Sequence, residues 1–412
     1  MIVRMDMVIR ALAEGLDMVE AELLGATANH GKRVALLCAA MGRRLGLADA
    51  QIIPLTSCAL LHDNALTEYI HAEREGSGER DSMMKLHCEY GQRNAETLGF
   101  ATDISGFILY HHEWADGSGP FGRAQGNFPL EAELICLADS LDIQFQLQHL
   151  AVATMGGILR FVRENTGSRF TPRAADAFCQ VFDAPLLESL KDAAIIESAA
   201  TMIPHWLIDI NDQAISNLAS LVPRIIDYKS RFTRRHSAQI ANKSWLMGSY
   251  YGYSPTEHME LYLAAVLHDI GKLGIPTQIL EKPEKLTDEE YAEIMRHASL
   301  TYEILRNIQG FEHICEWASS HHEKLDGSGY PAGKTRDELH FNSRLLACID
   351  MYQAISEERP YHPARNHQDT MEILHTIAQD GYIEPAIVQD MDAALKEYDG
   401  GDVPDPLVRA VP

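Results

Sequence analysis

The sequence predicts an all-α protein made of two tandem helical units that are related by internal duplication. Three observations support this fold class. Apolar residues recur at three-and-four spacing along most of the chain, alternating strand patterns are scarce, and one ordered set of histidines and aspartates occurs twice. A chain of 412 residues is long for one compact core but suits two units. We place these units at residues 1–205 and 206–412.

The duplication can be tested by subtraction, because a true repeat keeps nearly constant offsets except where loops change length. The offset is 206 residues for His30 and His236 and for His62 and His268, 210 residues for His87 and His297 and for His111 and His321, and 211 residues for Asp139 and Asp350. Most of the change in offset, from 206 to 210 residues, therefore comes from one loop, between the second and the third histidine of the set. This regularity indicates that one structural unit occurs twice.

The beginning of the chain and its composition limit the compartment and the partners. Residues 1–24 mix acidic and apolar side chains, which suits an amphipathic helix and not a signal sequence, and no later apolar run is long enough to span a membrane. Seven cysteines without paired spacing indicate reduced thiols. A net charge of -24 without a basic run argues against nucleic acid as a partner. We expect a cytoplasmic protein, either a homodimer or bound to a signalling protein.

The second histidine set lies on and between predicted helices. Residues 261–267 are almost entirely apolar and predict a buried helix that delivers His268 and Asp269 at its end. Thr287, three residues before Glu290, predicts a capping box for a helix that carries His297.

A third helix is predicted from about residue 312, carrying His321 and His322 and ending in the glycine-rich stretch 326–333. The first unit repeats this plan in residues 60–62, 84–98 and 104–112.

Histidine and aspartate in this order suit a two-metal hydrolytic site. Metal ions supply a nucleophilic hydroxide at neutral pH and hold developing negative charge. The two oxygens of Asp269 can bridge two ions while His268 fixes one of them. Lys272 lies on the same face if the helical path continues, where its ammonium can meet a phosphate oxygen. A lone pair of this kind is usually an ordinary hydrogen-bonded pair, but seven residues in one order, twice, favour a site.

The segments from His268 to Lys272 and from His321 to Pro331 resemble the two signatures of the HD-GYP family, a branch of the HD phosphohydrolase superfamily, and the resemblance covers roughly residues 225–400. It implies an all-helical HD-type fold and phosphodiesterase activity on cyclic dinucleotides, chiefly cyclic di-GMP and sometimes cyclic GMP-AMP, with iron or manganese as cofactor. The implied metal ligands are His236, His268, Asp269, His297, His321, His322 and Asp350. The implied catalytic residues are Asp269 and Lys272, and the implied substrate contacts are Lys272, Gly329, Tyr330 and Arg359.

Two positions depart from the family pattern. Phe232 stands where members with three metals have a glutamate, so we expect two divalent ions in this site. His362 replaces a basic residue after Arg359-Pro360-Tyr361, which reduces positive charge there above the usual histidine pKa of about 6.5.

The first unit keeps all seven ligand positions but loses the residues that would contact a phosphate. Its candidate second metal site comprises His30, His62, Asp63, His87, His111, His112 and Asp139. Leu66 replaces the lysine, and Gly119-Pro120-Phe121 replaces Gly-Tyr-Pro. This unit is a degenerate HD-type copy that is regulatory or structural, or that acts on a different phosphoester. The alternative is that its histidines only form hydrogen bonds within a packed core.

The function predicted from the sequence is a bacterial second-messenger phosphodiesterase. A metal-bridging hydroxide would open a cyclic dinucleotide to the linear dinucleotide, with Lys272 and Arg359 contacting the phosphate. Two alternatives remain: a cyclic-dinucleotide receptor that binds without turnover, and an HD phosphohydrolase of nucleotide monoesters.

Overall fold

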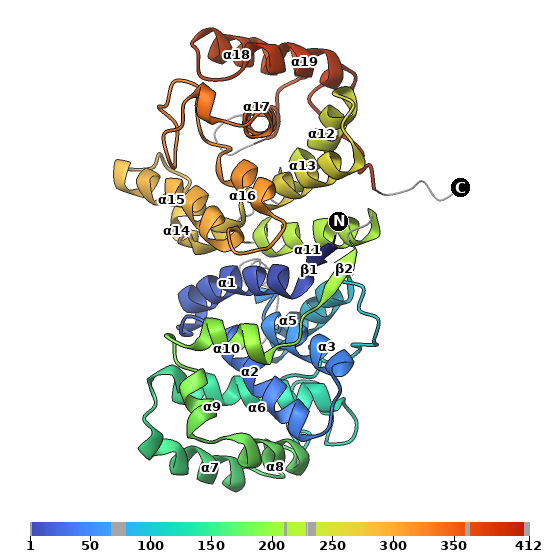
Figure 1. Cartoon of the computed structure of the whole chain (residues 1–412), viewed down its shortest axis with the longest axis vertical. Helices are drawn as coiled ribbons and strands as arrows, with labels where there is room; N and C mark the ends of the chain where they lie inside the picture. The colour runs from blue at the N-terminus through green and yellow to red at the C-terminus, as the bar shows by residue number, and fades with distance from the viewer. Residues whose placement is uncertain are drawn as a thin grey trace, which may run out of the picture. The chain divides into compact units, whose positions relative to one another are not determined.

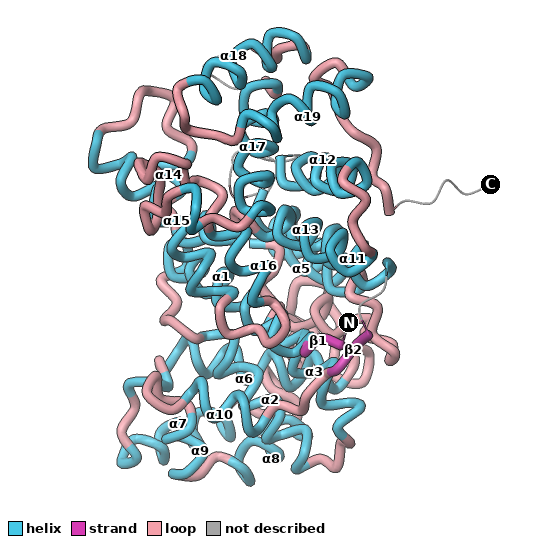
Figure 2. The backbone as a smooth tube through the Cα atoms, turned by 45° about the horizontal axis from the view of Figure 1, so that its top comes forward, coloured by secondary structure: helices cyan, strands magenta, loops and turns pink. Residues whose placement is uncertain are grey.

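The computed structural model describes residues 2–66, 80–209, 212–227, 229, 236–358 and 363–407, and it is mostly helical (Figures 1 and 2). Two short strands, β1 (Ile2–Arg4) and β2 (Leu207–Asp209), form a two-stranded sheet. The chain divides into two compact units, Arg4–Ile208 and Asp209–Pro412 together with Met1–Val3. The all-α prediction is confirmed. No helix within these described ranges is long and apolar enough to cross a membrane, and all seven cysteines are free thiols.

The N-terminal unit is an assembly of helices around α2. Its helices are α1 (Met5–Leu24), α2 (His30–Arg44), α3 (Asp49–Leu60), α5 (Arg80–Glu96), α6 (Leu130–Phe145), α7 (Met155–Glu164), α8 (Pro172–Val181), α9 (Ala184–Ser189) and α10 (Ile195–Met202), with short 3-10 turns η1 (Leu147–His149) and η2 (Val152–Thr154). Helix α2 packs against α1, α3, α6, α8 and α10. Even its Arg33 is fully buried, because its guanidinium donates a hydrogen bond of 2.7 Å to Asp142.

The C-terminal unit follows a similar order of elements. Its helices are α11 (Asp212–Asp227), α12 (His236–Tyr250), α13 (Pro255–Leu267), α14 (Thr277–Leu280), α15 (Asp288–Leu305), α16 (Glu312–Ser319), α17 (Phe341–Ser356), α18 (His367–Gln379) and α19 (Pro385–Leu395), with 3-10 turns η3 (Ile270–Gly274), η4 (Arg336–Glu338) and η5 (Lys396–Tyr398). Helix α17 packs against α12, α13, α16, α18 and α19, and Figure 1 shows it end on among them. Helices α12, α13, α15 and α17 correspond to α2, α3, α5 and α6 of the first unit.

Two helices that lead to the candidate site begin at capping boxes, and the sequence predicted the one at Thr287. Helix α13 starts at a capping box formed by Ser254 and Glu257, and every residue from Leu261 to Leu267 is buried. Helix α15 starts at the predicted capping box of Thr287 and Glu290. The amphipathic helix expected within residues 1–24 is α1. Capping satisfies the free amide groups at each start, so these helices begin at defined positions.

One helix is shorter than predicted. Helix α16 ends at Ser319, and the adjacent His321 and His322 lie in the turn that follows it. In the first unit, residues 105–112 form successive turns and no helix. The histidine pair is therefore held by a turn. The apolar pattern of residues 312–319 does not show where the helix ends, because the turn depends on packing against neighbouring elements.

Candidate metal centres

The structure brings all seven predicted ligand residues of the C-terminal unit together. His236 begins α12, His268 and Asp269 follow α13, His297 lies in α15, His321 and His322 follow α16, and Asp350 lies in α17. Their donor atoms form three groups, each within 4.8 Å: His236, His268 and Asp350; His268, Asp269 and His321; and His297, His321 and His322. The groups share His268 and His321 and thus form one continuous cluster. Such a cluster suits a pair of ions.

Asp269 lies between the two ends of this cluster. Its Oδ2 is 3.2 Å from Nε2 of His268, and its Oδ1 is 3.6 Å from Nε2 of His297. The two oxygens of one carboxylate therefore face different histidines. This is the arrangement that a carboxylate bridging two ions requires, as the sequence suggested.

Backbone carbonyls fix the orientation of three histidine rings. The Nδ1 atoms of His268, His297 and His321 lie 2.7, 2.6 and 2.6 Å from the carbonyl oxygens of the residues three positions earlier. A carbonyl can only accept, so Nδ1 carries the proton and Nε2 presents its lone pair to the cluster. Among the described residues, the Nε2 of His268 and the Oδ1 of Asp269 are buried without a hydrogen-bond partner. Leaving such atoms unsatisfied costs about 1–3 kcal/mol each, and a bound metal removes that cost. The residues thus fit a metal centre.

Protonation states in the cluster also suit metal binding. Burial lowers the pKa of His297 to about 3 and that of His322 to about 4, so both imidazoles are neutral at pH 7. Burial opposes the charged form of Asp269, but His268 and Lys272 hold the pKa of this carboxyl well below its usual range. The neutral imidazoles of His297 and His322 and the ionised carboxylate of Asp269 are the forms that bind a divalent ion.

A further carboxylate orients His236 and was missed in the sequence. The Nε2 of His236 lies 3.2 Å from Asp350 and its Nδ1 lies 3.1 Å from Glu357. Burial disfavours the charged imidazole, but these two carboxylates outweigh it and raise the pKa of His236 to about 9. Glu357 follows Asp350 by seven residues, close to two helical turns, and this spacing is the signal that could have revealed it.

Lys272 lies at the cluster because the chain changes helix type. After α13 the backbone continues as the 3-10 turn η3, in which side chains three residues apart eclipse one another. This places the Lys272 ammonium 2.5 Å from Oδ2 of Asp269, with the lysine side chain 21% exposed. The sequence placed both residues on one face of a continuing α-helix. Lys272 and Asp269 do lie on the same face, as predicted, but the backbone between them forms a 3-10 turn and not an α-helix.

The glycine-rich loop after His322 is closed by a buried carboxylate. Glu323 accepts hydrogen bonds from the amides of Ala332 and Lys334 at 2.7 and 3.0 Å. Gly329 approaches so closely that a Cβ there would lie 2.3 Å from the amide nitrogen of Lys324. This packing brings the Tyr330 ring within 4.7 Å of the His322 ring, centroid to centroid. Tyr330 therefore adjoins the cluster, while Gly329 packs against Glu323, the residue after His322.

Three positions discussed from the sequence lie outside the described residues. They are Phe232, Arg359 and His362. The phosphate contact assigned to Arg359 therefore remains a prediction.

The N-terminal unit gathers its seven residues in the same manner. Asp63, His87, His111 and His112 form one group of donor atoms within 4.8 Å, and His30, His62 and Asp139 form another. The Nε2 of His87 is 2.9 Å from Asp63, and the Nε2 of His30 is 3.3 Å from Asp139. Leu66, at the position of Lys272, is buried. The donor set is thus retained, while an apolar side chain stands at the position of the lysine.

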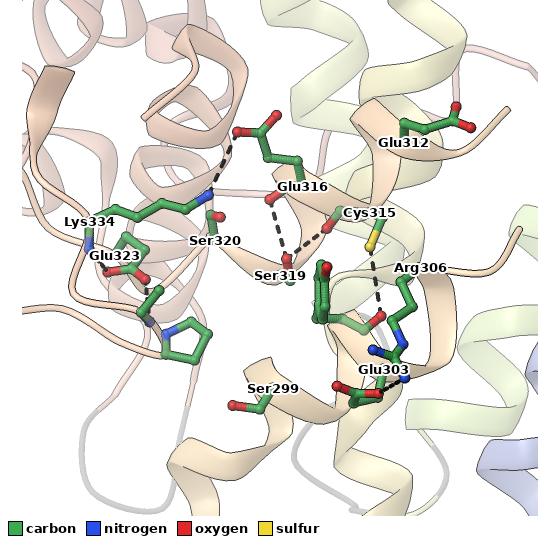
Figure 3. Close-up of a pocket in the computed structure, with 13 residues that line it drawn as sticks. Ser299, Glu303, Arg306, Glu312, Cys315, Glu316, Ser319, Ser320, Glu323 and Lys334 are labelled. Carbon is green, nitrogen blue, oxygen red and sulfur yellow. Dashed lines mark hydrogen bonds and ion pairs between the residues drawn. The ribbon is translucent and has the colours of Figure 1, made fainter. Parts of the chain in front are cut away.

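A cavity of about 590 Å³ in the C-terminal unit is a separate feature (Figure 3). It lies against α15, α16 and the glycine-rich loop, and none of its lining residues belongs to the ligand set. Both cations that line it are paired with carboxylates of the same wall, with Arg306 2.8 Å from Glu303 and Lys334 3.7 Å from Glu316. This cavity is therefore not the metal centre.

Known proteins share this arrangement. Two HD-domain models match residues 27–144 and 220–387. The chain therefore belongs to the HD-domain family and carries two HD domains in tandem.

Among individual proteins, the chain is 29% identical to 3'3'-cGAMP-specific phosphodiesterase 3 of Vibrio cholerae, over 79% of this chain and 69% of the relative. It is 26% identical to 3'3'-cGAMP-specific phosphodiesterase 1 of the same organism, over 88% and 85%. The crystal structure of a cyclic GMP-AMP specific phosphodiesterase of V. cholerae (V-cGAP3) shares the fold, with a TM-score of 0.67, 24% identity and coverage of 96% and 98%. The chain is a homologue of cyclic-dinucleotide phosphodiesterases.

Proposed function

We propose that the C-terminal unit is a metal-dependent phosphodiesterase that hydrolyses a cyclic dinucleotide, 3'3'-cGAMP or cyclic di-GMP, to the linear dinucleotide. The observation that carries this proposal is the continuous cluster of seven histidine and aspartate residues, in which Asp269 lies between two groups of histidines. The names of the relatives favour 3'3'-cGAMP as the first substrate to test.

The residues of the cluster divide into two sets of ligands. His236, His268 and Asp350 would hold one ion, and His297, His321 and His322 would hold the other, with Asp269 contributing to both. When bound, two divalent ions, iron or manganese, supply the nucleophilic hydroxide and neutralise charge on the phosphate. The carbonyl bonds to Nδ1 keep the imidazoles in the tautomer that metal binding needs.

Lys272 and the glycine-rich loop would position the substrate. Lys272 contacts Asp269 and is partly exposed, so its ammonium can exchange from the carboxylate to a phosphate oxygen. The Tyr330 ring, beside His322, offers an apolar face to a nucleotide. These residues would orient the scissile phosphate toward the ligand cluster.

The test is turnover of 3'3'-cGAMP and cyclic di-GMP by anaerobically prepared protein loaded with iron or manganese. Asp269→Ala should abolish formation of the linear dinucleotide, whereas Asp63→Ala, the matched change in the N-terminal unit, should leave turnover within about threefold. Hydrolysis that persists in Asp269→Ala would contradict the proposal. Binding of either dinucleotide by the metal-loaded protein without any hydrolysis would instead identify a receptor.

A further inference from the structure

A cavity of about 620 Å³ opens beside the metal centre of the N-terminal unit. His112 and Asp139 line it, and they come from the two separate ligand groups of that centre. The remaining wall includes Trp114, Arg169 and the loop around Gly119. A cavity of this size suits a small organic ligand, and this one would place that ligand in contact with residues of the metal centre.

Arg169 supplies a cation to the wall of this cavity. Its guanidinium donates a hydrogen bond of 2.9 Å to the Ser140 hydroxyl, and its buried Nε has no hydrogen-bond partner in the part of the chain that the structure describes. Within the described ranges it forms no ion pair with a carboxylate. A guanidinium with unused donors in a cavity is suited to a phosphate, which it can bind through two parallel hydrogen bonds.

Trp114 supplies an aromatic face beside this cation. Its side chain is 39% exposed, although large aromatic residues are usually buried. The Arg169 guanidinium lies 5.3 Å from the centre of its ring. Base-stacking on an exposed indole, next to a phosphate-binding arginine, is a common way to hold a nucleotide.

In the C-terminal unit, the two positions that correspond to Trp114 and Arg169 also hold a cation and an aromatic residue, but in the opposite order. The amide of Ala115 donates to the carbonyl of Arg169 at 3.1 Å, and the amide of Leu325 donates to that of Tyr382 at 3.0 Å, so Arg169 and Tyr382 are structurally equivalent. In the C-terminal unit the residue before Leu325 is the cation, with the Lys324 ammonium 4.7 Å from the Tyr382 ring. The N-terminal unit has exchanged cation and aromatic residue.

We propose that the N-terminal unit binds a nucleoside monophosphate in this cavity. Arg169 holds the phosphate, Trp114 stacks on the base, and the phosphate faces the side of the cavity formed by His112 and Asp139. This site is independent of the proposed phosphodiesterase activity, because it uses other residues in another unit.

The test uses the full chain carrying Asp269→Ala, a change that impairs the C-terminal centre. This protein is loaded with manganese, and GMP binding is measured by calorimetric titration. About one GMP should bind per chain. Arg169→Gln in this background should weaken GMP and inorganic phosphate about tenfold or more without affecting guanosine, because only the charged hydrogen bonds are lost. Trp114→Ala should weaken GMP and guanosine about tenfold without affecting phosphate. Arg160→Gln, an exposed arginine of α7, is the matched control and should change nothing.

Circular dichroism and the manganese content of each variant separate ligand loss from misfolding, and Arg169→Lys should recover part of the phosphate affinity if charge is what matters. Absence of GMP binding by a folded Asp269→Ala chain that retains manganese would overturn the proposal. Unchanged GMP affinity in both Arg169→Gln and Trp114→Ala would also overturn it. Failure of cyclic-dinucleotide turnover by the parent chain bears only on the C-terminal unit.

Discussion

The two units hold the same donor set in different surroundings. In each, seven histidine and aspartate residues come from corresponding elements and converge within a few ångströms. His62 and His111 are anchored through Nδ1 to carbonyls three residues earlier at 2.8 and 2.5 Å, as are their counterparts His268 and His321. These anchors belong to the backbone, so they are retained whatever happens to the substrate-facing side chains.

The surroundings differ in what can meet a substrate. In the N-terminal unit the first histidine, His30, is oriented by Asp142 at 2.7 Å, whereas His236 is oriented by Glu357 at 3.1 Å. At the offset of 211 residues the counterpart of Glu357 is Gln146, which is not a carboxylate. Lys272 beside Asp269 is matched by the apolar Leu66. The comparison teaches that the arrangement of the histidine and aspartate side chains, which depends on core packing, can be retained while a side chain next to it changes from a cation to an apolar residue.

The largest expected effect is on metal content. Fully loaded protein should bind about four ions per chain, two in each unit. Asp63→Ala and Asp269→Ala should each lower this to about two, because each aspartate belongs to only one centre. Mass spectrometry of metals after gel filtration measures the content. Unchanged metal in Asp63→Ala would mean that the N-terminal histidines serve only as hydrogen-bonded core residues.

The next effect concerns Lys272, the cation beside Asp269. Lys272→Met should lower kcat for the cyclic dinucleotide about 10²–10³-fold with metal content unchanged, because a charged contact to the phosphate is lost while the ligands remain. Leu66→Met at the matched position is the control and should leave kcat unaltered. Equal activity of Lys272→Met and the parent protein would show that Lys272 does not contact the phosphate during turnover.

A third difference lies in how closely the chain after the aspartate packs. A Cβ at Gly271 would lie 2.0 Å from the carbonyl oxygen of His297, whereas the matched residue of the first unit, Ala65, carries a Cβ and is fully buried. Gly271→Ala should destabilise the C-terminal unit by about 3 kcal/mol through overpacking, and Ala65→Gly should cost only about 1 kcal/mol. Hydrogen exchange resolves the two units. Equal costs at both positions would refute the difference in packing.

The smallest effect tests a feature that the units share. Glu113 accepts hydrogen bonds from the amides of Phe121 and Arg123, as Glu323 does from its own loop. Glu113→Gln and Glu323→Gln should each destabilise their loops by about 1–2 kcal/mol, seen as faster exchange of the bonded amides. Only Glu323→Gln should also reduce turnover, since its loop carries Tyr330. A similar loss of turnover in Glu113→Gln would indicate that the units are coupled in catalysis.

The sequence by itself determined the helical class, the duplication and the residues that converge. Metal chemistry restricts the residue types, and an ordered repeat with nearly constant offsets is visible without any structure. The capping boxes and the buried helix before His268 were equally predictable, since both rest on local patterns.

Only the tertiary structure decided the details that separate the two units. Three details depend on packing between elements of the fold. They are the 3-10 turn that brings Lys272 into contact with Asp269, the turn that carries His321, and the contact of the Glu357 carboxylate with His236. The exchange of cation and aromatic residue at Arg169 became visible only through a backbone hydrogen bond between segments more than fifty residues apart. Local sequence patterns carry no record of such contacts, because the contacts form only when the helices assemble.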